Sequence, residues 1–219
     1  MKIRSLSDLE DILDEDLAWR KKEISILTLE ASASKKRKKE VMMRTAMVLI
    51  YAHWEGHIKK AAHAYLAYLN HISPKYKDIK DNFFYLSLCE KFNGEVSFSG
   101  YRRQTHAFDY VKNGLNETFS ISVKKAVSTG SNLKSEIFSD ILIKLGLNEA
   151  DFELKYNLID EKLLKNRNAI AHGDESIHMD LEKDYLEVKE NVVEMMELFN
   201  TIIKNSASNK SYLKENTHQ

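Results

Sequence analysis

The chain has 219 residues, which is long enough to bury a substantial core and within the usual size of one domain. Seven glycines and a single proline leave few helix breakers, so the composition favours long helices over a sheet with many turns and predicts an all-α protein. Lys plus Arg equals Asp plus Glu at 33 each, which excludes a global positive field and requires any contact with nucleic acid to come from local clusters.

Two long helical patterns occupy the first third of the chain. Ser7, with Glu10 three residues later, predicts a capping box, and apolar residues then recur at helical spacing to about Ala31. A second and longer pattern runs from Val41 to Leu69, and Pro74 predicts a stop beyond it. We expect this second helix to form the centre of the core.

The middle of the chain carries weaker signals. Residues 74–94 predict a shorter helix, because proline is favoured near a helix start and a glycine follows the last apolar residue. Periodicity fades over about 95–131, where Gly, Ser, Thr and Asn are frequent, so we expect an irregular insertion with one or two short helices. Ser131 or Asn132 is predicted to cap the next helix, which ends at Gly146.

Two further helices are predicted near the C-terminal end. Apolar residues from Leu158 to Ile170 give the first of them one apolar side, and this helix ends at His172 and the glycine after it. The second begins near Asp180 and carries an apolar stripe to about residue 205. We expect residues 1–205 to form one helical domain and the polar residues 206–219 to form a flexible tail.

Cysteine usage and hydropathy indicate a compartment. The single cysteine, Cys89, cannot form an intramolecular disulfide, and no charged-then-apolar leader precedes the acidic segment that begins at Ser5, so we expect a cytoplasmic protein. The most apolar window, Val41 to Ala52, is interrupted by Arg44 and is too short to span a bilayer. We therefore expect no membrane partner.

The segment Lys-Asn-Arg-Asn-Ala-Ile-Ala-His-Gly at 165–173 holds the residues best suited to chemistry. Four residues separate Arg167 from His172, and Asn168 directly follows the arginine. The spacing alone is a weak signal, because basic residues in the last turn of a helix, followed by glycine, are common at helix C-termini. A functional site and a plain helix end are both compatible with this pattern.

In the penultimate helix of an all-α chain, this segment resembles the signature of HEPN domains, in which Arg is followed by a polar residue and, a few residues later, by His. The segment Tyr51-Ala52-His53-Trp54-Glu55-Gly56-His57-Ile58-Lys59 resembles the corresponding helix of the HEPN group often found in bacterial defence and toxin loci. The resemblance implies an up-and-down bundle of four to five main helices that dimerises. Many members cut RNA without a metal, and others only bind partners.

The residue types of this segment suit RNA cleavage on their own chemistry. A base must remove the proton of a ribose 2′-OH, after which the oxygen attacks the adjacent phosphorus and negative charge grows on the phosphate. His172 suits the proton transfer because the pKa of imidazole lies near neutrality, and Arg167 offers a planar donor fork that matches phosphate. Asn168 cannot take up a proton and is expected to orient a neighbour by hydrogen bonding. None of these steps requires a cofactor.

Helix geometry gives a reason for dimerisation. On an ideal helix, Arg167 and His172 lie about 140° apart, so they do not share a stripe. Two copies facing each other across a twofold axis would bring an Arg and a His from different subunits to one phosphate. His172 also lies near the negative end of the helix dipole, which favours its protonated form.

Three polar residues of the second long helix are auxiliary candidates. His53 and His57 lie four apart and suit zinc, but no third ligand has metal-like spacing, so we predict no metal site. We expect instead that one of His53, Glu55 or His57 faces the cleft of Arg167 and His172, while Trp54 anchors the core.

Two basic clusters could follow an RNA backbone. One is a run before the second long helix, and the other is a pair in the insertion. They are Lys35, Lys36, Arg37, Lys38 and Lys39, and then Arg102 and Arg103. A solvated helix start is the alternative explanation of the run.

Two functions remain in view. The first is a metal-independent endoribonuclease, of a toxin or defence type, that acts as a homodimer on RNA and leaves a 2′,3′-cyclic phosphate; an antitoxin or other regulatory protein is then a further expected partner. The second is a non-catalytic HEPN interaction module that dimerises and binds a protein or a nucleotide.

Overall fold

The computed structural model describes residues 2–92, 101–130, 132–174 and 181–215. Over these residues the chain is helical apart from turns, connecting segments and two isolated β-bridges, which confirms the predicted all-α class. In the part of the chain that is described, no helix is both long and apolar enough to cross a lipid bilayer.

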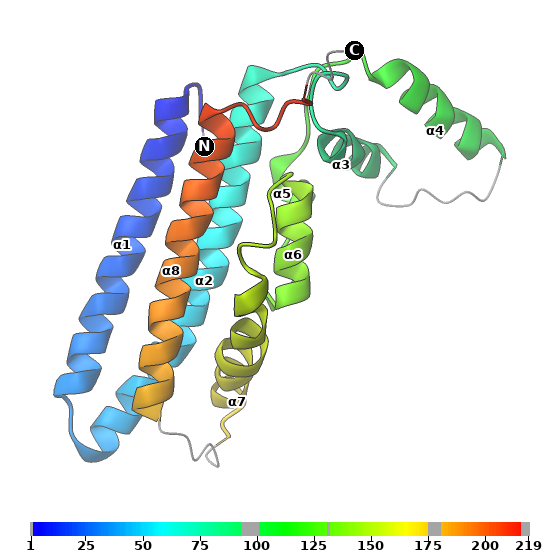
Figure 1. The fold of residues 1–219 in the computed structure, drawn as a ribbon. Coiled ribbons are helices and arrows are strands. Elements are labelled where there is room, and N and C mark those ends of the chain that lie inside the picture. The colour runs from blue at the N-terminus through cyan, green and yellow to red at the C-terminus, as the bar shows by residue number, and fades with distance from the viewer. Residues whose placement is uncertain (1, 93–100, 131, 175–180, 216–219) are drawn as a thin grey trace.

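Three long helices form the main body of the bundle and lie side by side (Figure 1). They are α1 (Leu6–Ala33), α2 (Lys36–Ile72) and α8 (Leu181–Ser208), and each packs against the other two. Helix α2 lies at the centre of the core, as its apolar pattern predicted, because it also packs against the shorter helices. Tyr51 and Trp54 of α2 are both fully buried.

Shorter elements line the other side of α2. In Figure 1, α6 and α7 run along the bundle, whereas α4 projects away from it. These elements are α3 (Asp81–Lys91), α4 (Tyr101–Gly114), α5 (Val123–Ala126), α6 (Ser135–Lys144), the 3₁₀ turn η1 (Glu153–Lys155), the π-helical segment η2 (Leu158–Leu164) and α7 (Lys165–Ala171). The predicted insertion falls partly outside the described residues, and its described part contains α4 and α5.

Helix α1 begins two residues earlier than its sequence pattern predicted. The N-cap is Ser5, whose hydroxyl accepts a hydrogen bond from the backbone N–H of Asp8 at 3.0 Å. The carboxylate of Asp8 accepts in turn from the backbone N–H of Arg4 at 2.8 Å. The start of the helix is therefore capped by Ser5 and Asp8, and not by the predicted pair of Ser7 and Glu10.

Helix α3 begins later than predicted, at Asp81, because the segment that starts with Pro74 pairs with another segment of backbone. The N–H of Phe119 donates to the carbonyl of Pro74 at 2.7 Å, and the N–H of Tyr76 donates to the carbonyl of Glu117 at 3.0 Å. Tyr76 is buried. This aromatic side chain is therefore buried in an irregular segment and does not belong to a helix.

The N-cap of α6 is Lys134 and not one of the two predicted residues. Ser131 lies outside the described residues. Asn132 precedes the helix by three positions, and its side chain contacts α7 instead. The carboxylate of Asp160 takes the capping role, because it accepts from the backbone N–H of Ser135 at 2.9 Å.

The chain after residue 205 is packed where the sequence predicted a flexible tail. Helix α8 continues to Ser208, and Tyr212 is buried in the core. The backbone N–H of Lys80 donates to the carbonyl of Tyr212 at 2.9 Å, and the N–H of Lys214 donates to the carbonyl of Asp78 at 3.0 Å. One buried aromatic residue and these backbone contacts outweigh the polar composition of the segment. Residues 216–219 lie outside the described part.

Candidate functional site

Helix α7 is placed against α2 by the segment that precedes it. Ile159 and Leu163 of η2 and Asn166 of α7 are buried, so one side of this continuous helical stretch faces the core. The stretch changes from π-helical to α-helical hydrogen bonding at residue 165. Segments with π-helical hydrogen bonding are uncommon in proteins, but those that occur are often found at functional sites. Here the change to α-helical hydrogen bonding comes just before Arg167.

Arg167 is held by three residues from three parts of the chain. Its Nη1 donates to Oδ1 of Asn132 at 2.7 Å and to Oδ1 of Asn168 at 2.6 Å. Its guanidinium carbon lies 4.5 Å from the ring centroid of Tyr51 on α2. Both hydrogen-bond partners are neutral amides, so these contacts orient the positive charge without neutralising it.

Tyr51 offers Arg167 a ring face while its hydroxyl is engaged elsewhere. The hydroxyl accepts from the backbone N–H of Leu133 at 2.7 Å. Burial raises the pKa of Tyr51 to about 12, with a further contribution from the nearby Glu55 carboxylate, while the Leu133 N–H and the charge of Arg167 act in the opposite direction. Tyr51 is therefore a neutral phenol at physiological pH. Of the three auxiliary candidates, Glu55 is the one that interacts with Tyr51, on the Arg167 side of α2.

His172 is exposed at the end of α7. It is the C-cap residue, and its backbone N–H donates to the carbonyl of Asn168 at 2.9 Å. Gly173 follows with φ +76°, and the N–H of Asp174 donates to the carbonyl of Ala169 at 3.0 Å, which completes a Schellman motif. Among the described residues, the side chain of His172 makes no hydrogen bond or ring contact with that of Arg167.

A shallow apolar groove lies between α2 and α7, next to these residues. Its volume is about 480 Å³. Ile170, which lies between Arg167 and His172 in the chain, forms its α7 side, and Arg44 connects its rim to the end of α7 by donating to the carbonyl of Asp174 at 2.9 Å. We call this surface the α2–α7 groove; its residues are Val41, Arg44, Thr45, Val48, Leu49, Ala52 and Ile170.

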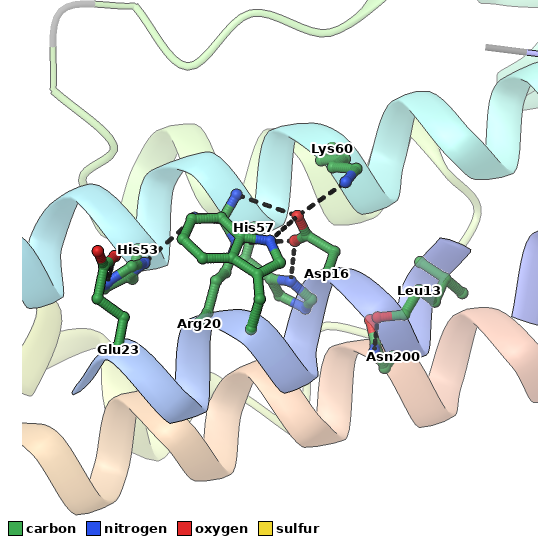
Figure 2. A network of polar contacts seen from close by, with 9 residues as sticks. Leu13, Asp16, Arg20, Glu23, His53, His57, Lys60 and Asn200 are labelled. Atoms are coloured by element: carbon green, nitrogen blue, oxygen red, sulfur yellow. Dashed lines mark hydrogen bonds and ion pairs between the residues drawn. The ribbon is translucent and has the colours of Figure 1, made fainter. Parts of the chain in front are cut away.

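His53 and His57 lie on the other side of α2, against α1 (Figure 2). Both side chains are buried. Nδ1 of His57 lies 2.8 Å from the carboxylate of Asp16 and donates to it, and Nδ1 of His53 lies 3.4 Å from Nη1 of Arg20. The structure therefore brings neither histidine to Arg167, whereas Glu55 interacts with Tyr51, the residue on whose ring Arg167 lies.

Asp16 is the centre of this buried cluster, and sequence reasoning did not single it out. Its two oxygens accept from Arg20 at 2.7 Å, from His57 at 2.8 Å, from Lys60 at 3.0 Å and from Trp19 at 3.1 Å. Burial raises the pKa of Asp16, but the hydrogen bonds from His57, Arg20 and Lys60 outweigh it and hold that pKa well below its ordinary value. We call Asp16, Arg20, His53, His57 and Lys60 the α1–α2 cluster. The sequence signal for this cluster was the spacing of four residues between Asp16 and Arg20, which places a carboxylate and a guanidinium on one face of α1.

His53 is enclosed by groups that act in opposite directions on its charge. Burial lowers its pKa, and the neighbouring guanidinium of Arg20 lowers it further, whereas Glu23 and Asp16 raise it. The net effect is a lowered pKa, so His53 is neutral at physiological pH. Among the residues that the structure describes, no three His, Cys, Asp or Glu side chains are arranged to hold a metal ion.

The basic run forms the exposed start of α2. Lys35 is the N-cap, and the side chains of residues 35–38 are exposed. Lys39 pairs with Glu182 at 2.5 Å, and Arg37 lies 3.5 Å from Glu40. Arg102 falls in α4, as does Arg103, and α4 lies at the opposite end of the molecule from the α1–α2 junction (Figure 1). The two basic clusters therefore do not form one surface, and the side chains of the pair lie outside the described set.

Comparison with protein families identifies the family of this chain. The family model described as RiboL-PSP-HEPN matches residues 15–205, a range that includes Arg167, His172 and the whole of α2. No curated protein and no solved structure matches the chain.

Proposed function

The chain belongs to the RiboL-PSP-HEPN family, and from this premise we propose that it is a metal-independent endoribonuclease that acts as a homodimer. HEPN domains are often nuclease domains. The observation that carries the proposal is the state of Arg167. Its guanidinium is fixed by two amide oxygens and an aromatic face, has no carboxylate partner among the residues that the structure describes, and lies five residues from an exposed histidine at a helix end.

Arg167 is the phosphate-binding group. The guanidinium has five N–H donors, and both hydrogen bonds found among the described residues use Nη1. A planar donor fork of fixed orientation suits the oxygens of a phosphodiester and stabilises the charge that develops on them as phosphorus is attacked. Asn132 and Asn168 act as positioning residues, since they contact the guanidinium and fix its plane.

His172 transfers the proton. In its neutral form it removes the proton of the ribose 2′-OH, the 2′ oxygen bonds to phosphorus, and the bond from phosphorus to the 5′ oxygen breaks. The departing 5′ oxygen takes a proton from the solvent, and the imidazolium of His172 then returns its proton to the solvent. The products are a 2′,3′-cyclic phosphate and a free 5′-OH. The exposure of His172 leaves it accessible to a substrate.

The α2–α7 groove supports dimerisation through this face. It exposes apolar residues, with Val41 at 52% exposure, and Ile170 joins it to the segment that carries the two functional residues. Within one chain the side chains of Arg167 and His172 do not meet, so a second copy seated on the groove would complete a site from both subunits. Such a nuclease suits a toxin or defence role, with an antitoxin or other regulatory protein restraining it.

The test of the proposal is direct. Purified protein is incubated with mixed RNA in excess chelator, and the 3′ ends of the fragments are examined. We expect fragments that end in 2′,3′-cyclic phosphate. Intact RNA with the wild-type protein would favour the second candidate, a non-catalytic module that uses the exposed groove only to bind a partner. Activity that disappears on chelation and returns with a divalent metal would contradict the metal-independent mechanism.

A further inference from the structure

A second concave surface lies on the opposite flank of α2 from Arg167, where α1, α2 and α5 meet. It encloses about 460 Å³. Five of its eight lining residues are basic types and none is acidic, although the whole chain carries equal numbers of basic and acidic residues. The lining residues are Arg20, Gly56, Lys59, Lys60, His63, Ala67, Val123 and Lys124. We call this surface the basic pocket.

Arg20 forms a rigid part of the wall. Its side chain is buried and bound to Asp16 through Nε at 2.7 Å, so its position is set before any ligand arrives. Gly56 allows the guanidinium to lie directly against α2, because a Cβ at this position would come within 2.9 Å of Nη1 of Arg20. A preorganised guanidinium beside open backbone is an arrangement that suits an anionic group.

The rim of the pocket carries two positive charges that have no ion-pair partner in the described part of the chain. Lys59 of α2 and Lys124 of α5 are exposed, and neither has a carboxylate within 4.0 Å among the described residues. His63 is neutral, since burial lowers its pKa and both lysines lower it further; its Nε2 donates to the carbonyl of Val127 at 3.2 Å. Asp16 offsets one of the two cations, Arg20 and Lys60, that contact it.

Solvation of two surface lysines is the ordinary explanation of such a rim. Solvation does not explain why the cations, which come from three helices, converge on one hollow instead of spreading over the surface. Bringing like charges together is unfavourable unless an anion binds between them. Ala67 and Val123 add apolar lining, which suits a ligand that has an apolar part beside its charged group.

We propose that the basic pocket binds a phosphate group, contacted by Lys59, Lys124 and the wall formed by Arg20 and Lys60. A nucleotide unit carries this chemistry, whether it belongs to an RNA strand or is free in solution. Along α2, Gly56 lies about 7.5 Å beyond Tyr51, the residue that Arg167 stacks on. A strand cut at Arg167 would therefore pass over the exposed face of α2 to reach the pocket, and only this RNA version rests on the proposed function.

The experiment measures binding and not cleavage. A short fluorescein-labelled oligouridylate is titrated with the His172→Ala protein, which keeps the strand intact, and AMP is titrated separately by calorimetry. Both titrations are repeated with Lys59→Gln and Lys124→Gln combined. The matched control combines Lys22→Gln and Lys77→Gln, which removes the same charge from exposed lysines that have no ion pair in the described structure.

We expect the pocket variant to bind the oligonucleotide about tenfold more weakly than the control variant. The slope of log affinity against log salt should fall by about 1.4 if two single-strand phosphate contacts are lost. A loss confined to AMP would also support the pocket and would identify a free nucleotide as its source of phosphate. Equal affinity of the pocket variant and the control for both probes would overturn the inference. Tight binding by a wild-type protein that cleaves nothing would contradict the nuclease function alone.

Discussion

The α1–α2 cluster and the end of α7 both contain arginine and histidine, but these residues have different roles in the two places. In the cluster, Arg20 binds the carboxylate of Asp16 and is buried with two histidines. At α7, Arg167 binds two neutral amides, and His172 is exposed. The partner of each arginine explains the difference: the carboxylate of Asp16 forms an ion pair with Arg20 within the packing of α1 on α2, whereas the two amides orient Arg167 without forming an ion pair.

Burial separates the histidines in the same way. His53 is enclosed and has a lowered pKa, so it stays neutral and serves the packing of α1 on α2. His172 has no such enclosure, because it is exposed and follows the last turn of α7. The comparison therefore predicts that changes at α7 affect activity without affecting stability, and that changes in the cluster do the reverse.

The largest effect is expected at α7. His172→Ala and Arg167→Ala should each lower the rate of RNA cleavage by about 10²–10⁴-fold, because each removes a group that acts in the transition state. Helicity, dimer mass and the midpoint of thermal unfolding should stay close to the wild-type values, because both residues lie at an exposed or half-exposed helix end. Initial rates with a labelled RNA and circular dichroism measure the two quantities. Variants that stay folded and fully active would refute the assignment, and variants that unfold would make the site structural.

The next effect is expected in the α1–α2 cluster. Asp16→Ala leaves Arg20 buried without its counter-ion, which typically costs about 3–5 kcal/mol of unfolding free energy. Urea denaturation checks this value, with Asp14→Ala as the matched control, since Asp14 is an exposed residue of the same helix. The cleavage rate per folded molecule should not change. A stable Asp16→Ala protein with reduced cleavage would reverse the comparison and connect the cluster to the active site.

A smaller effect tests whether the α7 site is shared between subunits. A mixed dimer of one Arg167→Ala chain and one His172→Ala chain retains one Arg and one His on opposite subunits. If the productive pair forms between subunits, part of the activity should return relative to either mutant homodimer, as measured with differentially tagged, co-expressed chains.

The control for the mixed dimer joins a wild-type chain to a chain that carries both substitutions, so that the surviving Arg and His come from one subunit. An inactive mixed dimer beside an active control of this kind would place the site within a single chain.

The smallest effect is the dependence of stability on pH. The folded-state pKa of His53 is lowered from 6.5, so its contribution to stability is present above that value and is lost as the pH falls below it. The folded-state pKa of Asp16 is lowered from 3.8, so its contribution is present above 3.8 and is lost in stronger acid. Thermal melts over this range should show that the loss of stability below pH 6.5 is smaller in His53→Gln than in the wild type. The loss of stability below pH 3.8 should be smaller in Asp16→Asn. Parallel curves for all three proteins would show that the cluster does not cause the acid sensitivity.

Local signals were enough to locate the helices and the segment of Arg167 and His172. Apolar periodicity repeats within a few turns, and the motif lies within one stretch of nine residues, so neither needs information from elsewhere in the chain. The boundaries that differ, at Ser5, at Asp81 and after residue 205, all depend on which backbone groups find partners. The tail is the clearest case, because Tyr212 is buried and its carbonyl accepts a hydrogen bond from Lys80, about 130 positions earlier in the chain.

The sequence by itself determined the helical class, the central place of α2 and the pair of residues to test, because periodicity and motif spacing are properties of neighbours in the chain. Only the tertiary structure decided what surrounds that pair. Asn132 and Tyr51 reach Arg167 from 35 positions before it and from the centre of α2, and no spacing rule connects them. The same holds for His53 and His57. The sequence shows that these two histidines share a helix face, but the residues that cover that face depend on how α1 packs against α2. In the structure this packing places Asp16 beside His57 and Arg20 beside His53. Glu55 instead interacts with Tyr51, on the side of α2 where Arg167 lies.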